Sequence, residues 1–378
     1  MSRYWAHILK EYNANGTISE FRGTNIKGPT ASGYSNGTLN LDYTVPDIED
    51  SSLTINDTNN TYPIVSYGSK GGVRLMPVVG YTVSGSYSGK LYAEQANFFI
   101  PAALLKYNAT TNPADDLPSF QIDRCYIDSD PVAPRLYADR YKGVKIGQLG
   151  ITVGATSPLV QMNMQLIGST CTEIAPTVTG GIIPISGKDP DCTSYPVKPY
   201  TFKDVSVYAD FTGTALFTTT AGVTNFATPA AAKKLLTVRS LSLSFQNVMA
   251  STSHNDGVLD RIQRTVTSVS YSLVVDLSDP DGSNSGDATL GSLIWRDRYR
   301  KMRDSINGGM VALAVIINNG SGAANQRIVF SLGKNTGFDG VQTITPIPDI
   351  FSAQISGSAM YDSATCNVFD WDISTSAT

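Results

Sequence analysis

The sequence predicts a mainly β protein built from two related β-sandwich or barrel halves, each with one helix. Three observations favour this fold class. Apolar and polar residues alternate with a period of two in several segments, as expected for strands buried on one face. Segments with helical periodicity are rare. The 378-residue chain is rich in Gly and Tyr and only 16% charged, below the roughly 25% of ordinary soluble domains, which suits short strands and turns.

The first 170 residues contain an arm and a first β-half. Residues 1–62 are rich in Gly, Asn, Ser and Thr, and we expect an extended arm with hairpins there. Residues 63–170 are assigned to the first half, because strand-like alternation occurs at 79–87, 149–153 and 160–166. Between these runs a helix is expected over Glu94–Tyr107, although Pro101 opposes it by removing a backbone donor.

A linker and a second half follow. Residues 171–199 contain repeated Pro and Gly, which is typical of a linker. Residues 200–378 form the second half, with alternation at 241–245, 269–277 and 351–361 and a helix expected over Leu290–Ile306. The segment Ser84–Ser88 (SGSYS) is similar to Ser268–Ser272 (SVSYS), so the order of elements indicates a loose internal repeat.

Charge and apolar patterning exclude several classes. The formal net charge of −4 argues against a dedicated nucleic-acid binder, which needs Lys and Arg to neutralise phosphates. Residues 1–12 lack the apolar run of a secretion signal, and the apolar stretch Met310–Ile317 is far too short to span a bilayer. We therefore expect a soluble chain made in the cytoplasm. The four cysteines, Cys125, Cys171, Cys192 and Cys366, form no zinc motif; pairing of Cys171 with Cys192 stays open.

The residues that catalysis would need are scarce. The chain has two histidines, His7 near the start and His254 in a turn-like segment, and both are expected to be loop residues in solvent. Gly33–Gly37 matches the G-x-S-x-G nucleophile elbow, with Ser35 as the nucleophile. That elbow must be followed by a helix, whereas Thr38–Tyr43 alternates like a strand, so a turn is expected.

Phosphate, metal and DNA sites are equally weak. No phosphate-binding Gly-rich loop ending in Gly-Lys-Ser/Thr occurs. Asp279–Asn284 resembles half of a calcium loop, but Asp287 comes too early and is too short to close it. The second predicted helix carries a basic face that is expected to be solvated, or to meet an acidic neighbouring subunit, rather than to read DNA; its residues are Arg296, Arg298, Arg300, Lys301 and Arg303. We expect no catalytic residue, no cofactor and no metal.

Several segments, taken in order, carry a resemblance to a known family. They are Val83–Tyr87 followed by Ala102–Leu105, Tyr141–Ile151 leading to Met162–Gly168, and Tyr200–Val205 with Val238–Asn247. Together they resemble the tail tube (major tail) proteins of long-tailed bacteriophages, in the version with two β-halves per chain. The arm at 16–62, the segment 218–232 and the basic helix have no counterpart in that resemblance.

The resemblance implies a structural virion protein without enzymatic activity. Copies would join edge to edge into a closed β-barrel ring of three, or alternatively six, and the rings would stack into a tube. The lumen would hold the tape-measure protein and later conduct double-stranded DNA during ejection. Distal tail and tail terminator proteins would be further partners, and the chain would reside in the virion tail after assembly in the host cytoplasm, without membrane insertion.

The residues support ring formation independently. Residues 269–277 carry no charge before Asp276, whereas an isolated protein usually blunts its sheet edges with charge or proline. Pairing with a neighbouring copy would satisfy the open edges. A wall of hydroxyls and carboxylates would let DNA slide without sticking. The arm and the linker are the expected sites of contact between stacked rings.

Two other classes compete with this interpretation. A receptor-binding, adhesive or decoration protein of the virion would use tyrosine rings and polar loops to bind sugars. A hydrolase would need Ser35 to be nucleophilic.

Overall fold

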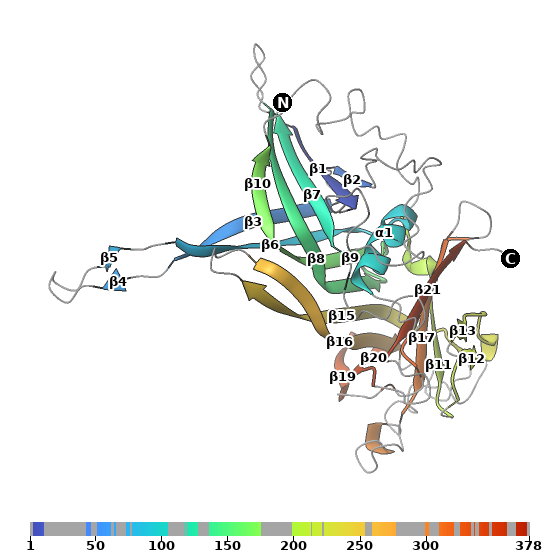
Figure 1. The fold of residues 1–378 in the computed structure, drawn as a ribbon. Coiled ribbons are helices and arrows are strands. Elements are labelled where there is room, and N and C mark those ends of the chain that lie inside the picture. Colours follow the sequence, from blue (N-terminus) through green and yellow to red (C-terminus); the bar gives the residue numbers. More distant parts are fainter. Residues whose placement is uncertain are drawn as a thin grey trace.

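The computed structural model gives a mainly β chain, and the strand pairs among the described residues are antiparallel (Figure 1). The predicted mainly β class is therefore confirmed. The residues that the structure describes are 3–10, 43–46, 51–61, 64–65, 73–75, 78–104, 117, 119–127, 136–174, 199–212, 214–220, 223–253, 259–276, 299–301, 310–320, 326–333, 336, 340–347, 350–360 and 368–375.

The elements up to residue 174 are β1 (Arg3–Lys10), β2 (Tyr43–Pro46), β3 (Ser51–Thr61), β4 (Ile64–Val65), β5 (Val73–Leu75), β6 (Val78–Lys90), α1 (Ala93–Ala103), β7 (Phe120–Ile127), β8 (Leu136–Gly154), β9 (Gln161–Gly168) and β10 (Thr170–Ile174). Thus β3 lies within the predicted arm, and β10 takes in the first residues of the predicted linker.

The later elements are η2 (Phe202–Asp204), β11 (Val205–Asp210), β12 (Thr218–Thr220), β13 (Val223–Asn225), η3 (Ala231–Lys233), β14 (Lys234–Leu235), β15 (Val238–Ser253), β16 (Leu259–Asp276), β17 (Ala312–Asn318), β18 (Gln326–Ser331), β19 (Gly340–Ile347), β20 (Ile350–Ser358) and β21 (Asp370–Thr375). The six alternating segments of the sequence overlap β6, β8, β9, β15, β16 and β20, as predicted; Val160 lies just before β9, and Leu277 and Tyr361 lie outside the described residues.

The first predicted helix is present and shorter than expected. It ends at Ala103, whereas the sequence placed its end at Tyr107. Pro101 lies in its last turn, where a proline disrupts few helical hydrogen bonds. Of the second predicted helix the structure describes residues 299–301, which are helical, with Tyr299 against the core and Arg300 exposed. No helix in the described part of the chain is both long and apolar enough to cross a membrane.

One sheet runs through both halves of the chain. Its strands pair in the order β3-β6-β9-β8-β15-β16-β20-β19, and we call it the long sheet. The pairing of β8 with β15 joins strands from the two halves. The long sheet does not close on itself among the described residues, so β3 and β19 are its two edges.

Each half adds a short sheet, and the two short sheets have matching strand orders. The first short sheet is β10-β8-β7-β1-β2, and the second is β21-β18-β17-β11-β14. The long sheet repeats in the same way, because β3-β6-β9-β8 corresponds in chain order and pairing to β15-β16-β20-β19. The two halves therefore share one strand topology.

Strand β8 belongs to the first short sheet and to the long sheet at once. Its first part pairs with β7 and β10, and its second part pairs with β9 and β15. Gly143, with φ +65°, lies between the two parts, where a Cβ would come 2.8 Å from Ser169 Cβ. In the second half the equivalent path is divided into β18 and β19.

A large apolar core lies between the long sheet and the elements that cover it. In the first half Tyr87 of β6 stacks on Phe99 of α1, with ring centroids 5.6 Å apart. In the second half Phe245 of β15 lies 5.3 Å from the rings of both Phe330 and Phe369. The apolar strand β17 is buried on both faces, because a second small core packs on its far side; that core includes Tyr208, Phe217, Phe226, Ala314, Ile316 and Val329.

Candidate functional site: the polar face and open edges of the long sheet

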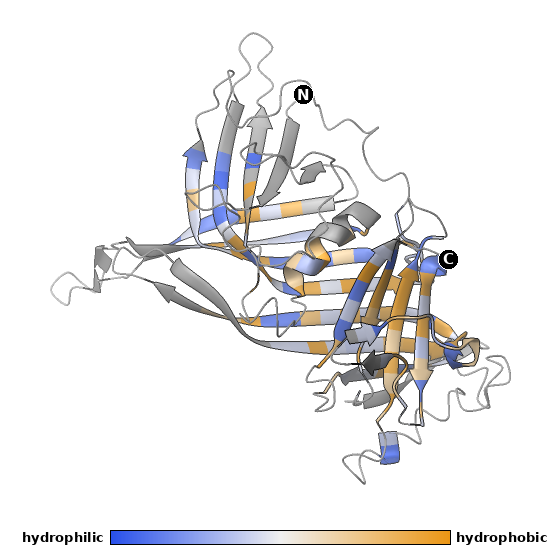
Figure 2. Ribbon diagram, turned by 45° about the vertical axis from the view of Figure 1, so that its right-hand side comes forward, coloured by the Kyte–Doolittle hydropathy of each residue, from blue (hydrophilic) through white to orange (hydrophobic). Residues whose placement is uncertain are grey.

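The face of the long sheet that turns away from the core consists largely of small, uncharged polar side chains. Along β16, for example, buried Tyr271 and Leu273 alternate with Ser270 and Ser272. Figure 2 shows this alternation as pale or blue bands between orange ones. We define the polar face by Thr54, Thr82, Ser84, Ser86, Ser88, Gln148, Thr152, Gln161, Asn163, Gln165, Ser240, Ser242, Ser244, Gln246, Ser268, Ser270, Ser272, Ser352, Gln354, Ser356 and Ser358.

The central part of the polar face has no formal charge. Asp, Glu, Lys and Arg are all absent from six strand segments, namely 82–88, 148–154, 161–167, 240–246, 268–274 and 352–358. Lys90 lies beyond this region, at the end of β6. The carboxylates that were expected beside the hydroxyls are therefore not found in these segments. A neutral surface of this kind neither attracts nor repels a polyanion strongly.

The side chains of the polar face bond to one another across neighbouring strands. Ser88 Oγ donates to Asn163 Oδ1 at 2.6 Å, which links β6 to β9. Gln354 Nε2 donates to Ser272 Oγ at 3.1 Å, which links β20 to β16. These contacts satisfy part of the hydrogen-bonding capacity of the face, which lowers its tendency to hold a passing ligand.

One of these bonds crosses the joint between the halves. Gln148 Nε2 of β8 donates to Ser244 Oγ of β15 at 3.1 Å. On the buried side of the same joint Asn247 Nδ2 donates to the carbonyl oxygens of Ala103 (2.9 Å) and Ile146 (3.0 Å). Asn247 thereby ties the end of α1 and strand β8 to the second half.

Each edge strand of the long sheet has one ladder neighbour among the described strands. Of these strands β3 pairs with β6, and β19 pairs with β20. Charged residues and prolines usually protect an exposed edge; the segments 51–56 and 340–345 contain neither, and Asp57 and Pro346 follow directly after them. Both edges are therefore suited to pairing with another strand.

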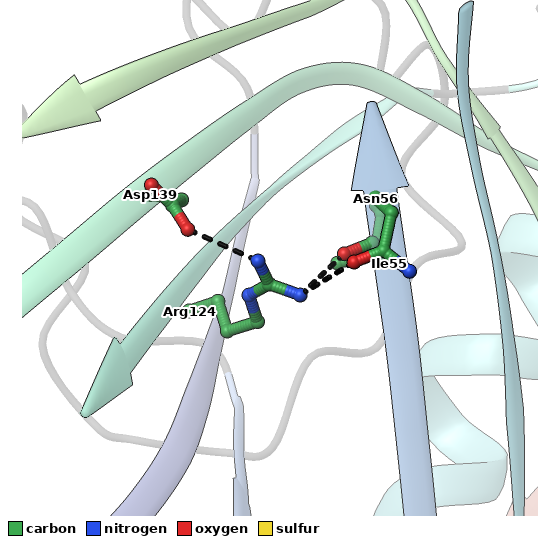
Figure 3. Close-up of polar contacts among 4 residues, drawn as sticks. All are labelled: Ile55, Asn56, Arg124 and Asp139. Carbon is green, nitrogen blue, oxygen red and sulfur yellow. Dashed lines mark hydrogen bonds and ion pairs between the residues drawn. The ribbon is translucent and has the colours of Figure 1, made fainter. Parts of the chain in front are cut away.

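Arg124 of β7 contacts the edge strand β3 and anchors it to the first short sheet (Figure 3). Its Nη1 donates to the Ile55 carbonyl oxygen at 2.6 Å and to Asn56 Oδ1 at 3.0 Å. Its Nη2 forms an ion pair with Asp139 of β8 at 3.0 Å, and its guanidinium lies 5.4 Å from the centre of the Tyr141 ring. The contact ties β3 to the first short sheet at Ile55 and Asn56.

Of the candidate catalytic residues of the sequence, the structure describes His7 alone. His7 lies in β1, opposite Thr44 and Asp123 in the sheet register, so it is a strand residue and the expected loop position is wrong. Ser35 and His254 lie outside the described residues, as do Asp279–Asn284 and Asp287. Of the basic residues in the second predicted helix, Arg300 and Lys301 are described, and both are exposed.

The titratable groups whose pKa values are shifted belong to the packing of the fold. Burial would raise the pKa of Asp210, but hydrogen bonds from Thr212 and the ammonium of Lys233 at 3.5 Å lower it below its ordinary value. Burial raises the pKa of the free Cys171 thiol. Cys192 lies outside the described residues. The part of the chain that the structure describes contains no group of three His, Cys, Asp or Glu able to hold a metal.

Sequence reasoning found the polar alternation but not the joint between β8 and β15. The signal was present in part, because Leu149–Val153 and Leu241–Phe245 are both alternating, uncharged segments of similar length. Such segments are interchangeable as pairing partners, and only the tertiary arrangement selects one pair.

A scan against models of known protein families and a search of curated proteins both found no match to this chain. The strand topology, the polar face and the open edges are therefore the basis of the function proposed for it.

Proposed function

We propose that this chain is the structural subunit of a bacteriophage tail tube. The observation that supports this most is the long sheet, which runs through both halves, ends in two edge strands whose segments 51–56 and 340–345 are uncharged, and has a neutral polar face. Copies would join edge to edge until the sheet closes as a barrel, and the resulting rings would stack into a hollow tube.

Ring closure would place β3 of one copy beside β19 of the next. A head-to-tail contact between two different surfaces of a subunit closes into a ring when its rotation divides the circle. The contact inside the chain, between β8 and β15, is already of this kind. Each copy would then add two equivalent sets of four strands, which favours three copies over six. At about 4.8 Å per strand, three copies make a wall roughly 37 Å across before strand tilt widens it.

The polar face would line the lumen, and the short sheets would lie outside. Before infection the lumen would hold the tape-measure protein, and during ejection it would conduct double-stranded DNA. DNA binding depends on Lys and Arg that neutralise phosphates. Because the central segments of the polar face contain neither, the duplex would slide along hydroxyls and amides without being retained.

The remaining partners follow from the tube. The distal tail and tail terminator proteins would meet the two ends of the stack, and the chain would reside in the virion tail. The contacts between stacked rings were expected from the arm at 16–62 and the linker at 171–199. Most of these two segments lies outside the described residues.

An adhesive, sugar-binding role has less support. Sugar rings stack on exposed aromatic faces, whereas Tyr87, Tyr141, Tyr200, Tyr208 and Tyr271 are all buried. These tyrosines pack the two cores and are not displayed on the polar face. No observation among the described residues favours a hydrolase.

The test is the assembly state of the purified chain. We expect negative-stain images to show hollow filaments with regular cross-striations, and mass measurement of partly dissociated samples to give closed rings of three. A protein that stays monomeric at high concentration would overturn the proposal. Glycan binding without any polymerisation would favour the adhesive class instead.

A further inference from the structure

The joint between β8 and β15 has a defined register. Leu243 lies opposite Ile151, and Ser244 lies opposite Gly150, in a ladder that extends from Ser240↔Gly154 to Gln246↔Gln148. Leu241, Leu243 and Phe245 of β15 are buried together with Leu149, Ile151 and Val153 of β8. The joint is therefore continuous on its apolar side, and a slip of one residue would turn every one of these side chains to the polar face.

The first edge strand, β3, has the position in its half that β15 has in the second half. Leu53 of β3 lies opposite Tyr87 of β6, and Leu243 of β15 lies opposite Tyr271 of β16. All four residues are buried. The two tyrosines are also the fourth residues of the similar segments SGSYS and SVSYS. Leu53 therefore corresponds to Leu243, and Thr54 corresponds to Ser244.

The other edge strand, β19, has the position in its half that β8 has in the first half. Gly150 lies opposite Asn163, which lies opposite Ser88 in β6. Gly340 lies opposite Ser356, which lies opposite Ser272 in β16. Ser88 directly follows Tyr87, and Ser272 directly follows Tyr271. Gly340 therefore corresponds to Gly150, and Val341 corresponds to Ile151.

We propose that β19 of one copy pairs with β3 of the next in the same register as β8 with β15. The pairs are Leu53↔Val341, Thr54↔Gly340, Ser52↔Gln342 and Ser51↔Thr343. This inference rests on the proposed function, because it needs copies to meet edge to edge, and it deepens that function by specifying which residues meet.

The chemistry of the pairs agrees with this register. A glycine opposes a hydroxyl residue in both joints, as Gly150 opposes Ser244. Leu53 is buried, and Val341 lies opposite buried Ile355 within its own hairpin, so their pairing continues the apolar layer from one copy to the next. Polar residues oppose each other at Ser52 and Gln342, as Ser242 and Thr152 do inside the chain.

The ends of the two edges also agree with this register. Strand β19 begins at Gly340, which the register places opposite Thr54. The next residue of β3 is Ile55, whose carbonyl oxygen already accepts from Arg124 at 2.6 Å (Figure 3). The ladder between copies would therefore start where the contact with Arg124 ends.

Disulfide trapping in assembled tubes tests the register. Opposed residues of an antiparallel pair have Cα atoms about 4.5–5.5 Å apart, within the range that a disulfide bridges. In a chain carrying Leu53→Cys and Val341→Cys, mild oxidation is expected to link most copies into covalent closed rings on a non-reducing gel. The matched control, Leu53→Cys with Thr343→Cys, displaces one cysteine by two residues on the same strand and is expected to link at least tenfold less.

The outcomes separate the register from the function. If tubes form and the control pair links better than the first pair, the register is wrong and the tube subunit stands. If the unmodified chain forms no tubes, the proposed function itself fails. For variants that do not assemble, amide hydrogen exchange of the unmodified tubes decides: protection of residues 51–54 and 340–343 on assembly is expected, and unchanged exchange there overturns the pairing.

Discussion

The two halves share a strand order, yet they cover the buried face of the long sheet differently. In the first half α1 and a short sheet that shares β8 with the long sheet provide the cover. In the second half the short sheet is separate, and a further small core packs on its far side. The four strands of the long sheet keep their alternation in both halves, because they need only an apolar layer on one face and not a particular partner element.

The two halves also differ in how the short sheet of each half is connected to the long sheet. In the first half a single strand, β8, belongs to both the first short sheet and the long sheet, so the backbone conformation at Gly143 sets how the two sheets are oriented relative to each other. In the second half residues 332–339 separate β18 from β19, and bridges between Thr336 and both Val311 and Ala359 tie this connection down. The second short sheet is thus joined to the long sheet by this connection and by packing, and not by a shared strand.

The largest expected effect comes from removing the Phe245 ring, which packs β15 against the elements that cover the long sheet in the second half. Phe245→Ala should cost about 3–5 kcal/mol of the free energy of unfolding, because it empties space between Phe330 and Phe369. Urea unfolding of the unassembled chain measures it. Val248→Ala, at an exposed residue of the same strand, should cost less than about 0.5 kcal/mol; equal losses would contradict this assignment.

The joint between the halves is tested by Asn247→Ala. This change leaves the carbonyl oxygens of Ala103 and Ile146 without their donor and should cost about 2–3 kcal/mol. Hydrogen exchange should then rise at the end of α1 as well as in β15, because both halves use this side chain. Faster exchange confined to β15 would indicate that the halves are not coupled there.

The bend in β8 can be compared with the equivalent turn after β18. Gly143 and Gly333 both have positive φ, at +65° and +72°. A Cβ at Gly143 would meet Ser169, whereas a Cβ at Gly333 has no atom within 4 Å. Gly333→Ala should therefore cost about 1–2 kcal/mol for the backbone alone, and Gly143→Ala should cost more. Thermal or urea unfolding checks the order, and the reverse order would refute it.

The smallest expected effect is a pH dependence of stability that arises from Asp210 in the second short sheet. The pKa of Asp210 is lowered in the folded chain, so its contribution to stability is present above the ordinary carboxyl pKa and is lost as pH falls through the lowered value. Thr212→Val removes a hydroxyl donor to Asp210 and should move the midpoint of acid unfolding to higher pH. In an Asp210→Asn background the same substitution should leave the midpoint unchanged.

Much of the fold could be predicted from the sequence, because the signals are local. The alternating runs predicted β6, β8, β9, β15, β16 and β20, and the helix expected from Glu94 onward was found as α1. The uncharged polar partners of those runs, such as Ser270 and Ser272, also indicated the polar face. The position of His7 was missed, because a terminal histidine carries no periodic signal that distinguishes a strand from a loop.

By itself, the sequence determined that the six alternating segments form strands and which face of each is buried, since a period of two is a property of neighbouring residues. Only the tertiary structure decided that β8 serves two sheets, that β8 meets β15, and that β3 and β19 are left as edges. Uncharged alternating strands can pair in many orders with similar local energies. The selection comes from the shared core, where Phe245, Tyr87 and Asn247 fit a single arrangement.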